Sequence, residues 1–282
     1  MSDPDSGWGE LVEGWERSAA GWGRQADRFR AVAMPVSTWM IQHMALAPGQ
    51  RVLELAAGPG DTGFLAAEAI APGGTLVCSD GAEGMLEVAR GRATRLGIEN
   101  VEFQRLELEW IDLPTASVDA IVCRWGFMLS ADPAAAFQEA RRVLKPGGRV
   151  ALAVWDAAER NPWATIPRAA LLTLGHTSPA DPSGPGMFAL AAPGRLREML
   201  AGAGFLDMLV EGVELDRDYP GLEDYLGETR DLARSFAEAW EGLTDEQRAE
   251  VRRTIASLAE PFTAADGSLR LPGRTLVAGA SA

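Results

Sequence analysis

The sequence predicts an α/β fold with a Rossmann-like, doubly wound sheet of seven mostly parallel strands. Three observations lead to this prediction. Short apolar runs alternate with helical patterns between residues 51 and 154, and this order is typical of βαβ units. Turns rich in Pro and Gly, such as Pro72-Gly73-Gly74, separate the runs. With 282 residues, 47% of them hydrophobic, the chain is long enough to bury the core of such a domain.

The chain begins with a predicted helical cap over residues 1–47. Trp8, Trp15 and Trp22 recur every seven residues within a helical pattern, so they share one face of a helix. Two interpretations of this face stay open. It packs onto the core, as aromatic stripes usually do, or it forms a lid over a ligand site.

Seven apolar runs after the cap predict the strands of the sheet, and the segments between them predict helices. The expected strands are 51–56, 75–79, 101–106, 118–123, 149–154, 205–215 and 274–280. The expected helices are 61–70, 82–96, 133–144 and 193–202. Gly97, Gly204 and the Pro146-Gly147-Gly148 turn end three of these helices.

Two segments depart from this alternation. Residues 156–192 are rich in Pro, Gly and Ala, and a loop of this length in a compact domain is usually functional. Residues 221–260 predict two helices, the second starting with a capping box of Thr244 and Gln247. The expected organisation is a cap over 1–47, a cofactor domain over 48–214 and 273–282 with an active-site loop region at 156–192, and a helical lid over 215–272.

Composition and charge disfavour several classes of protein. The net charge of −14 argues against binding to nucleic acid or to anionic membranes, because both need a basic face. Cys78 and Cys123 each end an apolar run, which predicts buried thiols and a reducing compartment. With no apolar leader and no apolar run of membrane-spanning length, we expect a cytoplasmic protein. His43 and His176 lie far apart in sequence, so no metal site is predicted.

The most informative segment joins the first strand to the helix that follows it. Gly58-x-Gly60-x-x-Gly63 allows a tight turn there and lets a ligand approach the backbone and the helix N-terminus. Asp80 follows about 20 residues later, where a carboxylate can accept hydrogen bonds from both hydroxyls of a ribose. These residues predict a nucleotide site but do not choose the cofactor.

Three further positions fall at strand ends or just after them. Glu107 with Leu108 follows the third strand, where an acid and a backbone N–H could bind the edge of an adenine. Glu109 and Asp112 are close enough in sequence to take that role instead. Arg124 ends the fourth strand, next to the crevice that ligands use in open α/β sheets.

Together these segments resemble class I S-adenosylmethionine (SAM)-dependent methyltransferases. The resemblance is carried by Glu54-Leu-Ala-Ala-Gly58-Pro-Gly60, Asp80, Met85-Leu86, the strand with Asp119, and Arg142-Val-Leu-Lys-Pro-Gly-Gly148. It is strongest for the small-molecule group related to the ubiquinone/menaquinone-biosynthesis methyltransferases, and it is close over residues 48–156. It implies SAM as the cofactor, S-adenosylhomocysteine (SAH) as the product, and a last strand that runs antiparallel.

The resemblance also implies cofactor-binding roles for ten residues. Those expected at the methionine end of SAM are Trp22, Ala57, Gly58, Gly60 and the backbone of Arg124. Those expected at the ribose and adenine are Asp80, Gly81, Met85, Glu107 and Leu108. The family more often has Asp in place of Glu107 and a bulky apolar residue in place of Gly81. Met85 can also be explained as a core residue.

The expected chemistry is in-line transfer of the activated methyl of SAM to a small, apolar or aromatic molecule. Holding the acceptor close and aligned supplies most of the acceleration. We assign no catalytic base, because His43 lies on an apolar helix and His176 lies in a loop. Acceptor contacts are expected from the N-terminal tryptophans, residues 161–163, residues 185–188 and the helices at 221–260, with Tyr219 and Tyr225.

Two alternatives from other classes stay open. The first is an NAD(P)-dependent oxidoreductase, because Gly58-x-Gly60-x-x-Gly63 matches the dinucleotide fingerprint. Against it, the chain has no Tyr-x-x-x-Lys pair, and its single lysine, Lys145, lies in a turn. The second is a non-catalytic SAM-binding protein, because fold does not fix function. Either a monomer or a homodimer is compatible with the sequence.

Overall fold

The computed structural model describes residues 4–179 and 184–282 and contains a seven-stranded sheet in the order β3-β2-β1-β4-β5-β9-β6. The strands are β1 (Arg51–Glu54), β2 (Thr75–Asp80), β3 (Val101–Arg105), β4 (Val118–Arg124), β5 (Leu144–Trp155), β6 (Leu206–Glu214) and β9 (Arg274–Ser281). β1 to β5 pair in parallel, while β9 runs antiparallel between β5 and β6. The expected sheet is therefore confirmed, including the antiparallel last strand.

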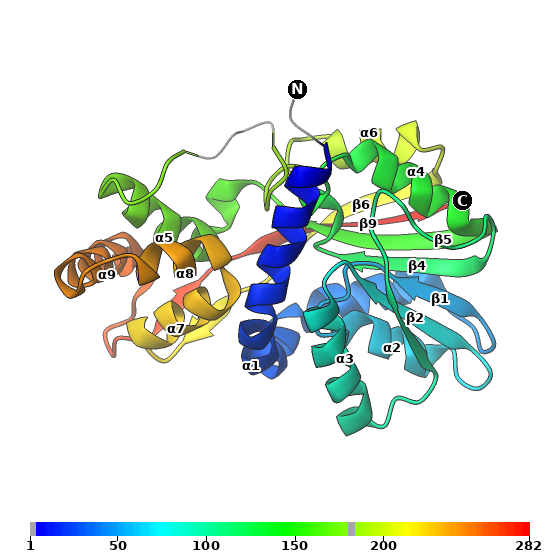
Figure 1. The fold of residues 1–282 in the computed structure, drawn as a ribbon, viewed down its shortest axis with the longest axis horizontal. Coiled ribbons are helices and arrows are strands. Elements are labelled where there is room, and N and C mark those ends of the chain that lie inside the picture. The colour runs from blue at the N-terminus through cyan, green and yellow to red at the C-terminus, as the bar shows by residue number, and fades with distance from the viewer. Residues whose placement is uncertain (1–3, 180–183) are drawn as a thin grey trace.

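Helices cover both faces of this sheet (Figure 1). They are α2 (Asp61–Ala69), α3 (Glu83–Leu96), α4 (Pro133–Val143) and α6 (Arg195–Gly202). In Figure 1, α4 and α6 lie above the sheet and α2 and α3 lie below it. The inner strands read as continuous apolar runs because both of their faces are buried; Leu53, Val77, Ile121 and Val122 have no exposed surface.

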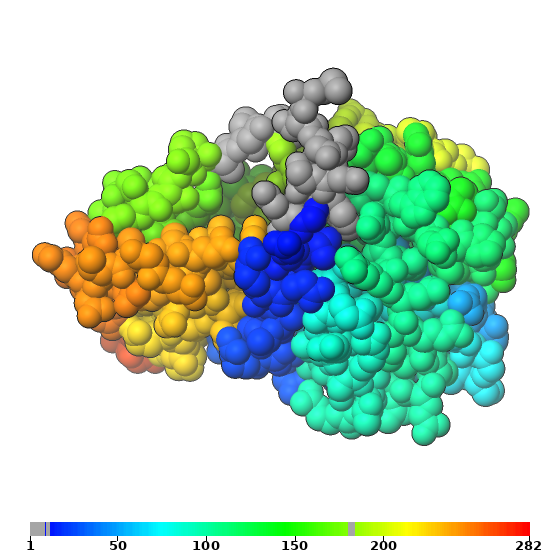
Figure 2. All heavy atoms as spheres, in the orientation of Figure 1, coloured from blue at the N-terminus to red at the C-terminus, as the bar shows by residue number. Residues whose placement is uncertain are grey.

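The helix α1 (Pro4–Met44) is 41 residues long and joins two parts of the molecule. It packs against α2, α3, β5 and β9 on the sheet side and against α7 on the other side. Figure 2 shows the blue atoms of α1 between the orange lid helices and the cyan helices of the sheet domain. The predicted cap is thus a single long helix.

A second apolar core lies beside the sheet. It is formed by elements within the segment 215–272, where a helical lid was expected, together with a helix from the preceding segment, and we use the name lid for this whole group. The lid consists of α5 (Pro162–Thr173), β7 (Arg217–Tyr219), α7 (Leu222–Leu232), α8 (Arg234–Glu241), α9 (Asp245–Ala259) and β8 (Leu269–Leu271). Its core is built from all of these elements, with Tyr225, Val251 and Ile255 at the centre. The described residues also form three short 3₁₀ helices, η1 (Phe127–Leu129), η2 (Ala158–Arg160) and η3 (Glu260–Phe262).

The lid contains more regular structure than the sequence predicted. Residues 156–192 were expected to form a loop, but α5 forms within them, because Pro162 takes the first helical position, where its missing N–H costs nothing. Two helices were expected over 221–260, but there are three, because the backbone at Ala233 is extended and divides α7 from α8. The β7–β8 pair was not predicted. The capping box of Thr244 and Gln247 is confirmed.

Candidate active site

The turn after β1 is shaped by glycines in conformations that other residues avoid. Gly58 has a φ of +52° and Gly60 a φ of +84°, and both lie in the left-handed region. Ala56 and Trp125 also have positive φ values, +50° and +63°. Such strain in residues other than glycine is typical of functional sites, and Ala56 and Trp125 both line the cavity described below.

Gly63, the third glycine of the motif, makes room for a buried acid rather than for a ligand. The N–H of Gly63 donates to Glu54 Oε1 at 2.7 Å. A Cβ at Gly63 would lie 2.1 Å from Glu54 Oε2. Glu54 is buried, and this burial raises the pKa of its carboxyl to about 8. The match to the dinucleotide fingerprint at Gly63 therefore has a structural explanation.

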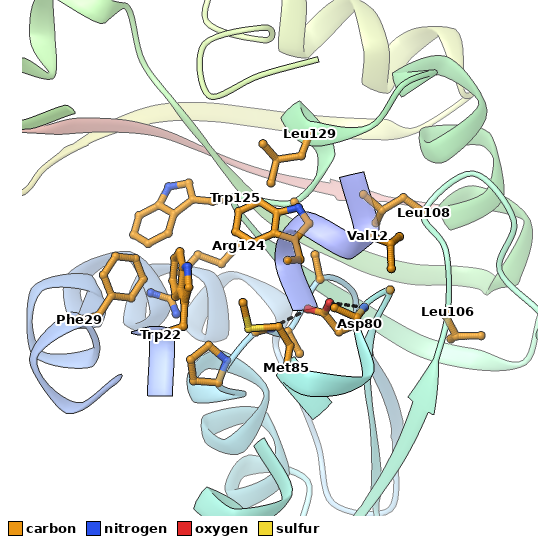
Figure 3. A pocket seen from close by; sticks show the side chains of 18 residues that line it. Val12, Trp22, Phe29, Asp80, Met85, Leu106, Leu108, Arg124, Trp125 and Leu129 are labelled. Atoms are coloured by element: carbon orange, nitrogen blue, oxygen red, sulfur yellow. Dashed lines mark hydrogen bonds between the residues drawn. The ribbon is translucent and has the colours of Figure 1, made fainter. Parts of the chain in front are cut away.

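Asp80, at the end of β2, is held by two backbone N–H groups. Gly58 N donates to Oδ2 at 2.8 Å and Ala82 N donates to Oδ1 at 3.0 Å. Each carboxylate oxygen keeps a further lone pair for a ligand. Burial raises the pKa of this carboxyl, and this effect is larger than the opposite effect of the two N–H groups, whose hydrogen bonds lower the pKa. The side chain is thus fixed in place at the wall of a cavity (Figure 3).

This cavity, which we call the crevice cavity, lies at the carboxyl ends of β1, β2 and β4 and is covered by α1. Eight of the ten residues that were predicted to bind the cofactor line it. They are Trp22, Ala57, Gly58, Asp80, Gly81, Met85, Leu108 and Arg124. Figure 3 shows Trp22 and Met85 on the side of the cavity opposite Leu108.

Gly60 and Glu107 are not among the residues that line the crevice cavity. Gly60 is the N-cap of α2, and the ring of Phe64 covers it, 2.5 Å from where a Cβ would be. Glu107 follows the end of β3 and is partly buried; its neighbours Leu106 and Leu108 line the cavity, but Glu107 does not. Glu109, the other candidate for the adenine role, accepts a hydrogen bond from Ser130 Oγ at 2.5 Å.

Two polar atoms at the crevice cavity have no hydrogen-bond partner among the described residues. They are Nε1 of Trp22 and Nη1 of Arg124. The other terminal nitrogen of Arg124, Nη2, lies 3.7 Å from Asp61 Oδ2. Buried donors are rarely left unpaired, so these two atoms are suited to the acceptor groups of a ligand.

The sequence analysis missed Phe29, which lines the crevice cavity together with Trp125. Phe29 comes seven residues after Trp22, so it continues the heptad of tryptophans, and that periodicity could have identified it. In the structure Trp22, Phe29 and Trp125 follow one another with ring centroids 4.9 and 5.4 Å apart. Trp15 and Trp22 both line the cavity and pack against buried residues, so both interpretations of the tryptophan face hold for them. The side chain of Trp8 lies outside the described part of the structure.

A second cavity of about 660 Å³, the lid cavity, lies between α5, residues 184–189, β7, α7 and α8. Some of the segments expected to contact the acceptor meet here, since Trp163, residues 185–188 and Tyr219 all line it. Trp15 and Trp22, which were also expected to contact the acceptor, line the crevice cavity instead. Tyr225 does not line it; its hydroxyl donates to the carbonyl oxygen of Trp163 at 2.6 Å.

Neither histidine lines either cavity. His43 stacks on Trp39 with ring centroids 3.7 Å apart, and its Nδ1 lies 2.8 Å from the carbonyl oxygen of Trp39. Both cysteines are buried, and burial raises the pKa of each thiol. Over residues 4–179 and 184–282, no cluster of three or more His, Cys, Asp or Glu side chains could hold a metal ion.

Comparisons with known proteins find similarity to methyltransferases. Residues 46–177 match the family model of a methyltransferase domain. The demethylmenaquinone methyltransferase of Clavibacter sepedonicus is 39% identical over 110 residues, which cover 38% of this chain and 43% of that protein. The nocamycin O-methyltransferase of Saccharothrix syringae is 26% identical over 239 residues, which cover 82% of this chain and 84% of that protein. The chain spans less than half the length of the arsenite and demethylmenaquinone methyltransferases that it matches.

Solved structures share the fold. The YcgJ protein of Bacillus subtilis superposes with a TM-score of 0.57 at 22% identity, covering 87% of this chain and 97% of that one. Phosphoethanolamine N-methyltransferase 2 of Haemonchus contortus, solved in complex with SAM, has a TM-score of 0.52 at 17% identity, covering 87% of this chain and 52% of that one.

The fold and the crevice cavity define an α/β domain of the kind that binds a nucleotide cofactor at the carboxyl edge of its sheet. Residues 46–177 are a class I SAM-dependent methyltransferase domain, and SAM is the cofactor of this class. The oxidoreductase alternative is not favoured.

Proposed function

We propose that the protein transfers the methyl group of SAM to a small, apolar or aromatic molecule. One observation carries the proposal. The crevice cavity brings together the fixed carboxylate of Asp80 and two donors, Trp22 Nε1 and Arg124 Nη1, that have no hydrogen-bond partner within the described ranges. A carboxylate such as that of Asp80 can accept hydrogen bonds from the hydroxyls of a ribose. The two donors can bind the carboxylate at the amino-acid end of SAM.

The residues at the crevice cavity can be assigned to each part of SAM in this proposal. Asp80 would accept from the ribose hydroxyls, with Gly81 and Met85 beside the adenine and Leu108 at its edge. Nη1 of Arg124 would donate to the carboxylate of the methionine moiety. This adds a side-chain role to the backbone role that was expected for Arg124. When bound, SAM supplies an activated methyl group on a sulfonium.

The contribution of the chain to the reaction is binding, alignment and exclusion of water. Val12, Trp15 and Trp22 of α1 cover the crevice cavity, so an aligned acceptor would react away from solvent. The acids at the two cavities are already engaged: backbone N–H groups hold Asp80, and Glu228 accepts from Tyr219 and Arg217. We therefore propose no general base.

We also propose a cytoplasmic protein that acts on small molecules without nucleic acid. Two buried free thiols support a reducing compartment, and the net charge of −14 supports the absence of a nucleic-acid partner. No helix in the described ranges has the length and apolarity needed to cross a membrane.

Calorimetric titration with SAM, SAH and NAD tests the cofactor, and an acceptor screen tests the reaction. We expect binding of SAM and SAH and none of NAD, followed by transfer of label from methyl-labelled SAM to a flat apolar acceptor. Binding of NAD alone would contradict the proposal. Binding of SAM with no transfer to any acceptor in the screen would favour the non-catalytic alternative.

A further inference from the structure

The lid cavity is large enough for a small molecule and carries more positive than negative charge. Its volume is about 660 Å³, within the usual range for ligand pockets. Its described lining includes two arginines, Arg168 and Arg217, and one acid, Glu228. This balance is opposite to that of the chain as a whole, which carries −14. An anionic ligand is therefore favoured at this place.

Arg217 is a buried charge whose hydrogen bonding is incomplete. The residue is 2% exposed, and its Nη1 donates to Glu228 Oε1 at 2.6 Å. Its Nε and Nη2 have no hydrogen-bond partner in the part of the chain that the structure describes. A buried charged donor left unpaired is costly. These two nitrogens lie on the same side of the guanidinium, and they are a pair that binds one carboxylate through two parallel hydrogen bonds.

Glu228 cannot neutralise this arginine by itself, because it is shared. Its Oε2 lies 2.6 Å from Nε of Arg28, and its Oε1 also accepts from the hydroxyl of Tyr219 at 3.0 Å. Two guanidinium groups therefore face one carboxylate. Arg28 is partly exposed to solvent, whereas Arg217 is not. The uncompensated charge thus lies on Arg217.

Arg217 also lies between the two cavities. Its Cζ is 3.8 Å from the ring centroid of Trp163, which lines the lid cavity, and 5.3 Å from that of Phe29, which lines the crevice cavity. Trp163, Met187, Phe188 and Phe236 supply apolar and aromatic surface around the lid cavity. A flat ligand anchored at Arg217 would therefore lie next to the expected cofactor.

We propose that the lid cavity binds the methyl acceptor, and that this acceptor is a flat apolar molecule with one carboxylate that pairs with Nε and Nη2 of Arg217. The role of the ligand as methyl acceptor rests on the proposed function. The binding of an aromatic carboxylate at Arg217 does not.

Titration of the full chain with SAH comes first, because it tests the cofactor separately. With SAH saturating, calorimetry then compares 2-naphthoate, its neutral carboxamide and 2-naphthyl phosphate. We expect the carboxylate to bind at least about tenfold more tightly than the carboxamide, and more tightly than the phosphate. Equal affinities, no measurable binding of any probe, or a preference for the phosphate would each overturn the proposal. If the unchanged protein does not bind SAH but still prefers the carboxylate probe over the carboxamide, the proposed function is overturned while the carboxylate site at Arg217 stands.

Arg217→Met removes the donors and leaves Glu228 with Arg28 and Tyr219. The preference for carboxylate over carboxamide is expected to fall to within about twofold, with SAH affinity unchanged. Arg252→Met, which changes an exposed arginine on α9 paired with Glu223, should keep the full preference. A full preference in Arg217→Met would contradict the assignment. If that variant does not fold, the comparison of 2-naphthoate with its carboxamide on the unchanged protein still tests whether the lid cavity prefers a carboxylate.

Discussion

Asp80 is the side chain on which the proposed cofactor depends most. Asp80→Asn removes the negative charge and one acceptor for the ribose hydroxyls, while the amide that replaces the carboxylate keeps one oxygen for a backbone N–H. We expect affinity for SAH to fall by about 10- to 100-fold, because hydrogen bonds to a charged group contribute about 1.5–3 kcal/mol. Calorimetric titration of the two proteins measures the loss.

Glu107→Gln is the matched control for that experiment. Its side chain does not line the crevice cavity, so SAH affinity should stay within about twofold of the unchanged protein. A large loss in Glu107→Gln together with none in Asp80→Asn would reverse the roles that the structure supports for the two acids.

Glu54 makes stability depend on pH. Its folded pKa of about 8 lies above its ordinary value of 4.5, so between these values the native state holds a proton that the unfolded chain releases. Its contribution is full below the ordinary value and is lost as the pH rises through the folded value. The slope reaches about 1.4 kcal/mol per pH unit.

Glu54→Gln removes this titration while its amide oxygen can still accept from the N–H of Gly63. We expect the free energy of unfolding, measured with urea from pH 5 to pH 8, to fall less steeply in the variant than in the unchanged protein. The variant should be the more stable of the two near pH 8. Parallel curves for the two proteins would contradict the burial of an uncharged Glu54.

At the residue scale, eight of the ten residues that the sequence predicted to bind the cofactor line the crevice cavity. Gly58 and Asp80 were found because their positions follow from the order of strand, turn and helix. The sequence did not show which of the residues after β3 line the cavity, because side-chain direction at a strand end depends on the exact register. Glu107 was chosen for this reason, although it does not line the cavity. Arg217 was not identified, because its importance comes from burial and from a shared partner on another element.

At the element scale, the glycine at position 63 fixes how α2 meets β1. Gly63→Ala would place a Cβ 2.1 Å from Glu54 Oε2, and we expect a loss of about 1–3 kcal/mol in the free energy of unfolding. Gly91→Ala on α3 is the matched control. Nothing lies within 4 Å of a Cβ there, so the better helix propensity of Ala should add about 0.5–1 kcal/mol. Denaturant unfolding measures both, and equal effects would contradict the tight contact at Glu54.

The elements of the sheet were easier to predict than those of the lid for a physical reason. Strands buried on both faces read as continuous apolar runs, as in β2 and β4. The helix α5 contains Pro162 and Pro167, which resemble loop residues in a sequence. Its helix is stabilised by packing of Ile166, Ala170 and Leu171 in the lid core, and such tertiary contacts override local propensity.

At the scale of the whole molecule, α1 holds the sheet domain and the lid together. On the sheet side, Glu16 accepts from the N–H groups of Glu83 and Gly84 at 2.6 and 2.7 Å. On the lid side, Gln25 Nε2 donates to Asp231 Oδ2 at 2.6 Å. Since α1 also covers the crevice cavity, its attachment on both sides links cofactor access to the position of the lid.

This attachment depends on a close approach at Gly21. A Cβ at Gly21 would lie 2.3 Å from the carbonyl oxygen of Asp231 on α7, so Gly21→Ala should separate α1 from α7. We expect faster amide hydrogen exchange in both helices, with exchange in β1 and β4 unchanged, because the contact lies outside the sheet. Gly227→Ala is the matched control on α7, since nothing lies within 4 Å of a Cβ there. Exchange that is faster in α7 alone, or equal in the two variants, would show that α1 does not couple the lid to the sheet domain.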